Sequence, residues 1–316
     1  MRASIIVCTR DRADSIGETL EALARQEPGG HEIVIVDTSN EQQRVRVRQL
    51  VEQHGGKYVF EPRSGLSIAR NTGIAHSSGE IVAFTDDDCI PAPDWVQQKL
   101  RHYEDPAVWC CTGRVVQHSS AGACDLFNEV AGQDLGQESR TFTREDTRFG
   151  PGVLFGNVAK VFAKHMKSRA PVPFGIGHGS STSFRREGLR QLKGFDERLG
   201  GGAPLKSADD TEMFWRILKS GHSIVYEPAA VVRHKHGLDQ ADVYKTRYGY
   251  SYGGAAFMWE NRGDALMRFM FCGRLIQLTL KTAQYKLTGN AELLVLKEFR
   301  GVRILSPRQF VEILDV

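Results

Sequence analysis

Strand-like and helix-like segments alternate through the first ninety residues of this 316-residue chain. The strand-like runs are apolar and rich in β-branched residues, at 3–8, 31–36, 57–60 and 80–84. The segments between them carry apolar residues at helical spacing, at 14–26, 42–54 and 67–76. This alternation predicts an α/β fold with a mainly parallel central sheet flanked by helices. Ligands of such sheets bind beyond the carboxyl ends of the strands, so the residues after each strand are the first candidates for a site.

The strand-like run that ends at Phe84 leads into three consecutive acids, Asp86, Asp87 and Asp88. On an extended chain the side chains of Asp86 and Asp88 leave the backbone on the same side. Two converging carboxylates suit Mg²⁺ or Mn²⁺, ions whose coordination is normally completed by phosphate oxygens and water. The other interpretation is a solvated acidic turn before the prolines at 91 and 93.

Polar residues also follow the two earlier strands, namely Thr9, Arg10, Arg12 and Asp37. No Gly-rich turn follows the first strand, which argues against both the dinucleotide-binding fold and the P-loop. Side chains and a metal would then have to hold a nucleotide. Arginines offer bidentate donors to phosphate, and Asp37 could accept from a base or ribose. In the third helix-like segment, Arg70 or Asn71 would face the phosphates.

Composition narrows the class of protein. A formal net charge of +3 and 25% charged residues indicate neither disorder nor attraction to nucleic acid. Six scattered cysteines without a CxxC pair fit reduced thiols in a cytoplasmic protein. Strand-like sequence begins by Ala3, and no stretch reaches the roughly 18 apolar residues of a spanning helix. We therefore expect a cytoplasmic protein without a nucleic-acid partner, and a homo-oligomer stays open.

Several motifs follow one another between residues 3 and 235. In order they read Ile-Val-Cys-Thr-Arg-Asp-Arg, Ile-Val-Asp, Gly-Leu-Ser-Ile-Ala-Arg-Asn-Thr-Gly-Ile, Phe-Thr-Asp-Asp-Asp-Cys, Gly-Phe-Asp-Glu, Ala-Asp-Asp-Thr-Glu-Met-Phe-Trp-Arg and Tyr-Glu-Pro-Ala-Ala-Val-Val-Arg-His. Together they resemble family-two glycosyltransferases with the GT-A fold. The resemblance implies a catalytic domain over 1–240, with a nucleotide-binding half at 1–117 and an acceptor-binding half at 118–240.

The resemblance also assigns roles to the donor side of the site. By position, Asp86 would bind the ribose of a sugar nucleotide and Asp88 the metal, with Asp87 between them. Arg70 matches a basic position near the donor. The nucleotide-binding edge is matched by Thr9, Arg10, Arg12 and Asp37. His234 stands where the family often has a histidine, so it could be a third ligand for Mn²⁺, and a structural or acceptor-contacting role is equally open.

On the acceptor side, Asp209 and Asp210 stand where many members carry Glu-Asp, just before a helix. The resemblance makes Asp210 the general base, which would take the proton of the acceptor hydroxyl as it attacks. Asp209 is left as a substitute base or an acceptor contact, and both acids also suit the first turn of a helix. Gly179 and Ser180 would let a sugar approach the backbone. Trp95 would stack on a sugar face, unless it is a core aromatic.

The last part of the chain, 241–316, has a different character and is expected to be a helical extension. Between Arg262 and Arg303 basic residues outnumber acidic ones. Its apolar residues include Phe269, Met270, Phe271, Leu275, Ile276, Leu278 and Leu280, while Arg274, Gln277 and Lys281 share one helical face. Such a basic amphipathic segment could contact an anionic membrane surface or pack on the protein itself.

Taken together, the sequence predicts an inverting glycosyltransferase. It would move a sugar from a nucleotide-sugar donor, UDP-linked, to a hydroxyl of a glycan or lipid-linked acceptor, with Mn²⁺ or Mg²⁺ as cofactor. One alternative is a sugar-nucleotide nucleotidyltransferase, which should have a Gly-rich phosphate loop after the first strand. The other is a catalytically silent carbohydrate-binding protein of the same fold, against which Asp86, Asp88 and Asp210 argue.

Overall fold

The computed structural model describes residues 1–118, 134–148, 172–235, 240–274, 298–299 and 302–303. The chain forms two compact units. The first comprises 1–148 and 169–250, and the second 149–168 and 251–316. The expected domain boundary at residue 240 lies where helix α9 (Gln240–Glu260) begins, ahead of the unit boundary at Tyr250.

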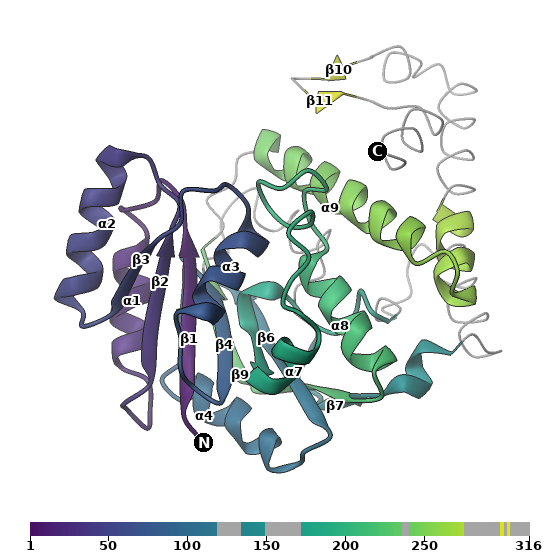
Figure 1. Ribbon diagram of the computed structural model, residues 1–316, viewed down its shortest axis with the longest axis horizontal. Helices are drawn as coiled ribbons and strands as arrows, with labels where there is room; N and C mark the ends of the chain where they lie inside the picture. Colours follow the sequence, from purple (N-terminus) through teal and green to yellow (C-terminus); the bar gives the residue numbers. More distant parts are fainter. Residues whose placement is uncertain (119–133, 149–171, 236–239, 275–297, 300–301, 304–316) are drawn as a thin grey trace. The chain divides into compact units, whose positions relative to one another are not determined.

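Four parallel strands form the first part of the central sheet, in the order β3-β2-β1-β4 (Figure 1). They are β1 (Ala3–Thr9), β2 (Glu32–Asp37), β3 (Lys57–Phe60) and β4 (Ile81–Asp86). The helices that connect them are α1 (Ile16–Ala24), α2 (Glu41–Gln53) and α3 (Leu66–Ala75). All seven elements agree with the sequence expectation to within two residues at either end.

Beyond β4 the sheet is mixed, and its order continues β4-β8-β6-β9-β5 with β7 on β9. Strand β8 is antiparallel to both β4 and β6, whereas β6 and β9 are parallel. These strands are β5 (Cys89–Pro91), β6 (Val108–Gln117), β7 (Arg140–Phe142), β8 (Thr182–Arg185) and β9 (Ser223–His234). The helices among them are α4 (Trp95–Leu100), α7 (Arg186–Gln191) and α8 (Asp209–Lys219), with 3₁₀ turns η1 (Arg101–Glu104), η2 (Arg144–Thr147) and η3 (Gly179–Ser181).

Helices cover both faces of the sheet, and the alternation of side chains along each strand divides the core in two. In β1, Ile5 and Val7 pack with residues of α1, α2 and α4, while Ile6 packs on the other face with residues of α3, α7 and α8. The strands are therefore apolar on both faces, which explains why they read as continuous hydrophobic runs.

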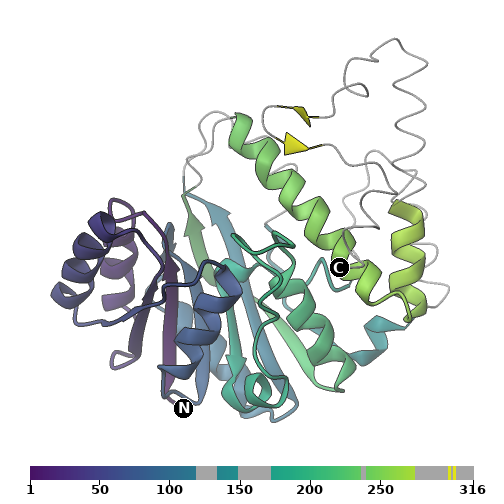
Figure 2. The same ribbon diagram turned by 45° about the horizontal axis from the view of Figure 1, so that its top comes forward.

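The register brings the polar strand ends to one edge. Thr9 at the end of β1 pairs with Asp37 of β2, and Cys8 pairs with Asp86 of β4. Strand β5 returns beside β9, where Cys89 pairs with His234. The purple and blue strands that carry this edge lie side by side in both views (Figure 1, Figure 2). Residues far apart in the sequence thus meet beyond the carboxyl ends of β1, β2 and β4.

The second unit contains the end of α9, a helix over residues 265–274, and the short antiparallel pair β10 (Glu298–Phe299) and β11 (Val302–Arg303). Trp259 of α9 contacts Phe271 of the next helix, with ring centroids 5.4 Å apart. No helix in the described ranges is both long enough and apolar enough to cross a membrane. The tail residues Leu275, Ile276, Gln277, Leu278, Leu280 and Lys281 lie outside the described residues.

Candidate functional site

The three consecutive acids at the end of β4 point in two directions, Asp87 into the protein and Asp86 and Asp88 toward the expected ligand side. Asp87 is buried, and its carboxylate accepts from Thr9 Oγ1 at 2.7 Å and from Arg12 Nη1 at 2.9 Å. Burial raises the pKa of Asp87 to about 6, and Arg12 opposes this shift. Asp87 therefore ties β4 to the loop after β1, while Asp86 and Asp88 remain on the side predicted for a ligand.

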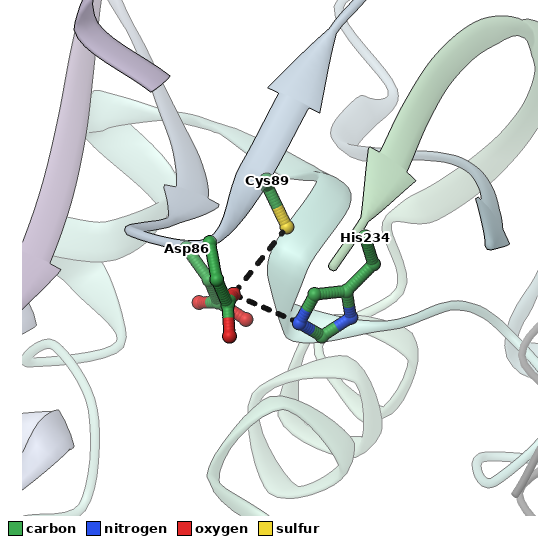
Figure 3. A group of neighbouring side chains, drawn as sticks. Asp86, Cys89 and His234 are labelled. Atoms are coloured by element: carbon green, nitrogen blue, oxygen red, sulfur yellow. Dashed lines mark hydrogen bonds and ion pairs between the residues drawn. The ribbon is translucent and has the colours of Figure 1, made fainter. Parts of the chain in front are cut away.

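Asp86 and Asp88 belong to a compact group of potential metal ligands. One ligand atom from each of Asp86, Asp88, Cys89 and His234 lies within 4.8 Å of the others. His234 Nε2 lies 2.9 Å from Asp88 Oδ1, and Figure 3 shows Asp86, Cys89 and His234 converging on one point. Burial raises the pKa of Asp86, and the charge of Asp88 raises it further. A divalent cation would relieve this concentration of negative charge.

Not all four residues of this group suit the same metal ion. Carboxylate oxygens and imidazole nitrogen suit Mg²⁺ or Mn²⁺, whereas a thiol is a soft ligand that these ions do not prefer. Cys89 is fully buried, and burial raises the pKa of its thiol well above the usual range. Asp86, Asp88 and His234 therefore fit a hard divalent cation, and Cys89 does not. Burial alone would lower the pKa of His234. The hydrogen bond with Asp88 and the charge of Asp88 outweigh the effect of burial, so the pKa of His234 is raised.

Two exposed arginines lie beside these acids. The Arg12 side chain is 53% exposed and reaches Asp88 Oδ2 at 3.0 Å as well as Asp87. The Arg10 side chain is 57% exposed, and its Nη1 donates to Ser64 Oγ at 2.8 Å. Both guanidinium groups can therefore be reached by an anionic ligand at the strand edge.

Asp37 differs from its neighbours because it is fully buried. One of its oxygens accepts from Ser39 N at 2.8 Å and the other from Tyr58 Oη at 3.0 Å. The sequence suggested that Asp37 accepts from a base or ribose, yet in this structure one oxygen binds the turn after β2 and the other binds Tyr58 of β3. Its carboxylate is therefore not accessible to a nucleotide in this arrangement.

Arg70 and Asn71, expected to offer one residue to the phosphates, both turn inward. Arg70 is buried, pairs with Asp209, and lies over the rings of Phe84 and Phe195. Asn71 donates through Nδ2 to Phe195 O at 2.9 Å and accepts from Phe195 N at 2.8 Å. Asn71 therefore ties α3 to the Gly-Phe-Asp-Glu segment. Neither side chain reaches the exposed edge, because each is committed to a partner more than a hundred residues away.

The adjacent acids at the start of α8 are distinguished by this pairing. Burial raises the pKa of Asp209 to about 6, although the charge of Arg70 lowers it. Asp210 instead accepts from two backbone amides, Thr211 N at 2.7 Å on Oδ1 and Gly179 N at 2.9 Å on Oδ2. Asp209 is therefore occupied by an ion pair, whereas Asp210 is oriented without a cationic partner among the contacts described.

Two aromatic residues that the sequence did not single out lie within electrostatic range of these acids. Burial lowers the pKa of His178, and the charge of Asp210 opposes the shift. Tyr250 is among the exposed large hydrophobic residues of the described part of the chain, at 43%, yet desolvation followed by the charge of Asp210 raises its pKa. The one signal for His178 was its position in a Gly-His-Gly turn, and nothing distinguished Tyr250 from the other tyrosines of α9.

Three residues expected to contact an acceptor are buried in the structure. Trp95 is 0% exposed, and its Nε1 donates to Ser181 Oγ at 2.9 Å, so no face of the indole is free to stack on a sugar. Ser180 is 2% exposed. Gly179 is also buried, but its amide contacts Asp210 directly. Of the two interpretations of Trp95, sugar stacking is therefore wrong and the core residue is the one found.

The chain is similar in sequence to known glycosyltransferases. A model of the family described as "Glycosyl transferase family 2" matches residues 4–192. A glucosyl-dolichyl phosphate glucuronosyltransferase of Haloferax volcanii is 26% identical over 242 residues, which cover 74% of this chain and 69% of that protein. A pre-mycofactocin glycosyltransferase of Mycobacterium tuberculosis is 25% identical over 255 residues, covering 80% of this chain and 48% of that protein. The chain thus spans about half the length of this second relative.

Solved structures share the fold. A mannosyltransferase from Pyrobaculum calidifontis, solved with GDP-Man and Mn²⁺, superposes with a TM-score of 0.59 at 20% identity over 99% of this chain and 84% of that one. TarS residues 1–349 of S. aureus, solved with UDP-GlcNAc, gives a TM-score of 0.56 at 16% identity over 94% and 76% of the two chains. These likenesses confirm the predicted GT-A type of α/β fold.

Proposed function

Because the chain belongs to glycosyl transferase family 2, we propose that it is an inverting glycosyltransferase that moves a sugar from a UDP-linked donor to a hydroxyl of a glycan or lipid-linked acceptor. One observation carries the proposal: the neighbouring acids Asp209 and Asp210 differ in their partners. Arg70 neutralises Asp209, while backbone amides orient Asp210. A carboxylate that is held in place without a cationic partner is suited to accept a proton.

The donor would lie across the ends of β1 and β4. In this proposal Arg10 and Arg12 face its diphosphate, since both guanidinium groups are exposed at the strand edge. Asp87 holds Arg12 in place, because its carboxylate accepts from Arg12 Nη1 and is itself fixed by the hydrogen bond from Thr9 Oγ1. Asp86 would accept from the ribose hydroxyls, as a carboxylate that needs donors opposite it.

Asp88 and His234 would hold a divalent cation, Mn²⁺ or Mg²⁺, beside the diphosphate, with the Asp86 carboxylate within 4.8 Å of both. When bound, the ion would neutralise the leaving group and fix its orientation. The protein's contribution would be to place Asp88, in the turn after β4, next to His234 at the end of β9. The short β5–β9 ladder does this, because it pairs the residue after Asp88 with His234.

Asp210 would act on the acceptor. Its carboxylate takes the proton of the attacking hydroxyl while the new bond forms at the anomeric carbon from the face opposite the nucleotide, in a single displacement that inverts the configuration. No covalent nucleophile is needed. The name of the relative from Haloferax volcanii, a glucosyl-dolichyl phosphate glucuronosyltransferase, supports a lipid-linked acceptor here. Peripheral membrane contact through the C-terminal extension would suit such an acceptor, and Arg262, Arg268 and Arg274 supply basic charge in its described part.

The test is donor hydrolysis and transfer across UDP-, GDP- and dTDP-sugars, with and without Mn²⁺, alongside calorimetric binding of UDP. Asp88→Asn should abolish transfer and weaken Mn²⁺-dependent UDP binding, because it removes a charged ligand. Asp14→Asn is the matched control, since Asp14 is an aspartate with an 82% exposed side chain that pairs with Arg46. UDP binding that ignores Mn²⁺ and is the same in Asp88→Asn would contradict the proposal.

A further inference from the structure

The 3₁₀ turn η3 determines how Asp210 is held. At its start, Gly179 N donates to Asp210 Oδ2 at 2.9 Å. A Cβ at Gly179 would lie 2.7 Å from Arg70 Nη2 and 3.3 Å from that same Asp210 oxygen. A Cβ at 2.7 Å would force the end of the buried Arg70 side chain to shift, so the close approach of this turn to Arg70 and Asp210 favours glycine at position 179. A small displacement of η3 would change the orientation of the Asp210 carboxylate.

The other end of η3 is fixed from behind by α4. Ser181 Oγ accepts from Trp95 Nε1 at 2.9 Å, and Ser181 O accepts from Lys99 Nζ at 3.0 Å. Both donors are buried, Trp95 at 0% and Lys99 at 1% exposed, and Lys99 Nζ lies 5.2 Å from the centroid of the Trp95 ring. One short helix thus holds the last residue of η3 through both its side chain and its carbonyl.

A buried ammonium is an expensive way to fill a core, because burial penalises its charge. Lys99 donates only to the carbonyls of Cys111 and Ser181 in the contacts described, with no buried acid in contact. An apolar side chain of the same length would fill this space without that cost, but it would leave Ser181 O without its donor. A three-residue 3₁₀ turn has few hydrogen bonds of its own, so its position depends on such outside partners.

We propose that Trp95 and Lys99 are positioning residues for the transfer reaction: by holding Ser181 they keep Gly179 N–H directed at Asp210. The inference rests on the proposed role of Asp210 as base. It gives Trp95 a function other than the sugar stacking suggested by the sequence. It also predicts that losing either contact lowers kcat while donor binding, which involves the ends of β1 and β4, is unchanged.

A matched pair of variants separates positioning from general stability. Ser181→Ala removes the acceptor of the Trp95 hydrogen bond. Ser183→Ala removes an equivalent bond two residues later, since Ser183 Oγ and Tyr103 Oη lie 2.8 Å apart in the same core. Each variant removes the hydrogen-bond partner of one buried aromatic side chain, and Ser183→Ala also removes the 3.2 Å bond from Ser183 Oγ to Cys111 O, so the control should lose at least as much stability as Ser181→Ala. Ser183 lies on β8 and not in η3, so it serves as the control.

Two measurements decide. With the donor found by the survey above, Ser181→Ala should lower kcat roughly ten- to a hundredfold with the donor KM within twofold, as expected for a misplaced catalytic group. Ser183→Ala should change neither. By NMR, hydrogen exchange of the Gly179 amide should accelerate in Ser181→Ala and not in Ser183→Ala. Because exchange needs no substrate, it tests the positioning even if no sugar donor is turned over.

Lys99→Met provides the second variant, and Lys99→Arg the rescue. Lys99→Met should reproduce the faster Gly179 exchange and the loss of kcat, and Lys99→Arg, which keeps a donor to Ser181 O, should recover part of both. Gly179 exchange that is equally slow in the wild type, Ser181→Ala and Lys99→Met would overturn the inference. So would a kcat loss in Ser183→Ala equal to that in Ser181→Ala.

Discussion

The buried ion pair between Arg70 and Asp209 makes a strong prediction about stability. The two side chains are 5% and 8% exposed, and Arg70 is enclosed by the rings of Phe84 and Phe195. Removing one partner of such a pair leaves a buried charge without compensation, which typically costs about 3–5 kcal/mol. Because a domain's total stability is about 5–15 kcal/mol, either Arg70→Met or Asp209→Leu should remove a large share of it.

The double variant tests the reasoning more sharply. Replacing both partners with apolar residues removes the stranded charge, so Arg70→Met combined with Asp209→Leu should be far less destabilised than the sum of the single variants. Urea denaturation followed by tryptophan fluorescence measures all four proteins, and unchanged m-values would show that the unfolded states are comparable. Single variants that each cost less than about 1 kcal/mol, or additive effects in the double variant, would refute the pair's role.

The pH dependence of Arg70→Met gives an independent check. Burial already raises the pKa of Asp209 to about 6, and Arg70 is the largest influence lowering it. Without Arg70 this pKa should rise further above its unfolded value of about 3.9. The native state then binds more protons than the unfolded state between those two values, so stability should fall as pH rises through this window. Asp209→Leu, which lacks the titrating group, should not show this fall.

Three further outcomes are expected. Asp210→Asn should leave UDP affinity within a few-fold but lower kcat by roughly 10²–10⁴ in steady-state kinetics. If Asp209→Asn showed this pattern and Asp210→Asn did not, the base would be Asp209 and the proposal for Asp210 would be wrong. Burial lowers the pKa of Lys99 to about 8 from an unfolded value of about 10.4, so the native state binds fewer protons across pH 8 to 10.4. Denaturation of the wild type relative to Lys99→Met should therefore show stability rising by up to about 3 kcal/mol over that window, and a pH-independent difference would contradict it. Sedimentation with anionic liposomes should be strongest at low salt if the basic tail contacts membrane, and an intact protein indifferent to anionic lipid would end that proposal.

The first half of the fold could be predicted because its signals are local. Strands β1 to β4 are short apolar runs, of which β1, β2 and β4 end in a polar residue, and the segments between them carry apolar residues at helical spacing. The later strands carry weaker signals because their partners are distant. Strand β5 is three residues long and reads as a turn after the aspartates, and it forms a strand only by pairing with β9, from Val232 to His234. No pattern within its own sequence records that partner.

The site shows the same limit in its charged residues. Sequence order could bring Arg70, Asn71 and Asp209 to the right region, but it could not show which side chains turn inward. That depends on partners such as Phe195 and on the packing of α3 against a loop more than a hundred residues away. The sequence left Trp95 open between a sugar face and the core for the same reason: an aromatic residue after two prolines has the same pattern whether its indole N–H contacts solvent or Ser181.

Both acidic runs follow one physical arrangement, and it explains why the chain can concentrate carboxylates at a single edge. In the first run Arg12 contacts the buried Asp87, and in the second Arg70 pairs with the buried Asp209. In each run an arginine contacts the buried acid, and the neighbouring acid is the one proposed to act in the reaction, although Arg12 also reaches Asp88. Without these arginines, the mutual repulsion and burial that already raise the pKa of Asp86 would act on every member of the cluster. The two arginines differ in exposure, 53% for Arg12 and 5% for Arg70. Arg12 can therefore also face a phosphate, whereas Arg70 is enclosed and its charge acts on the buried acids around it, Asp209 first and then Asp86 and Asp210.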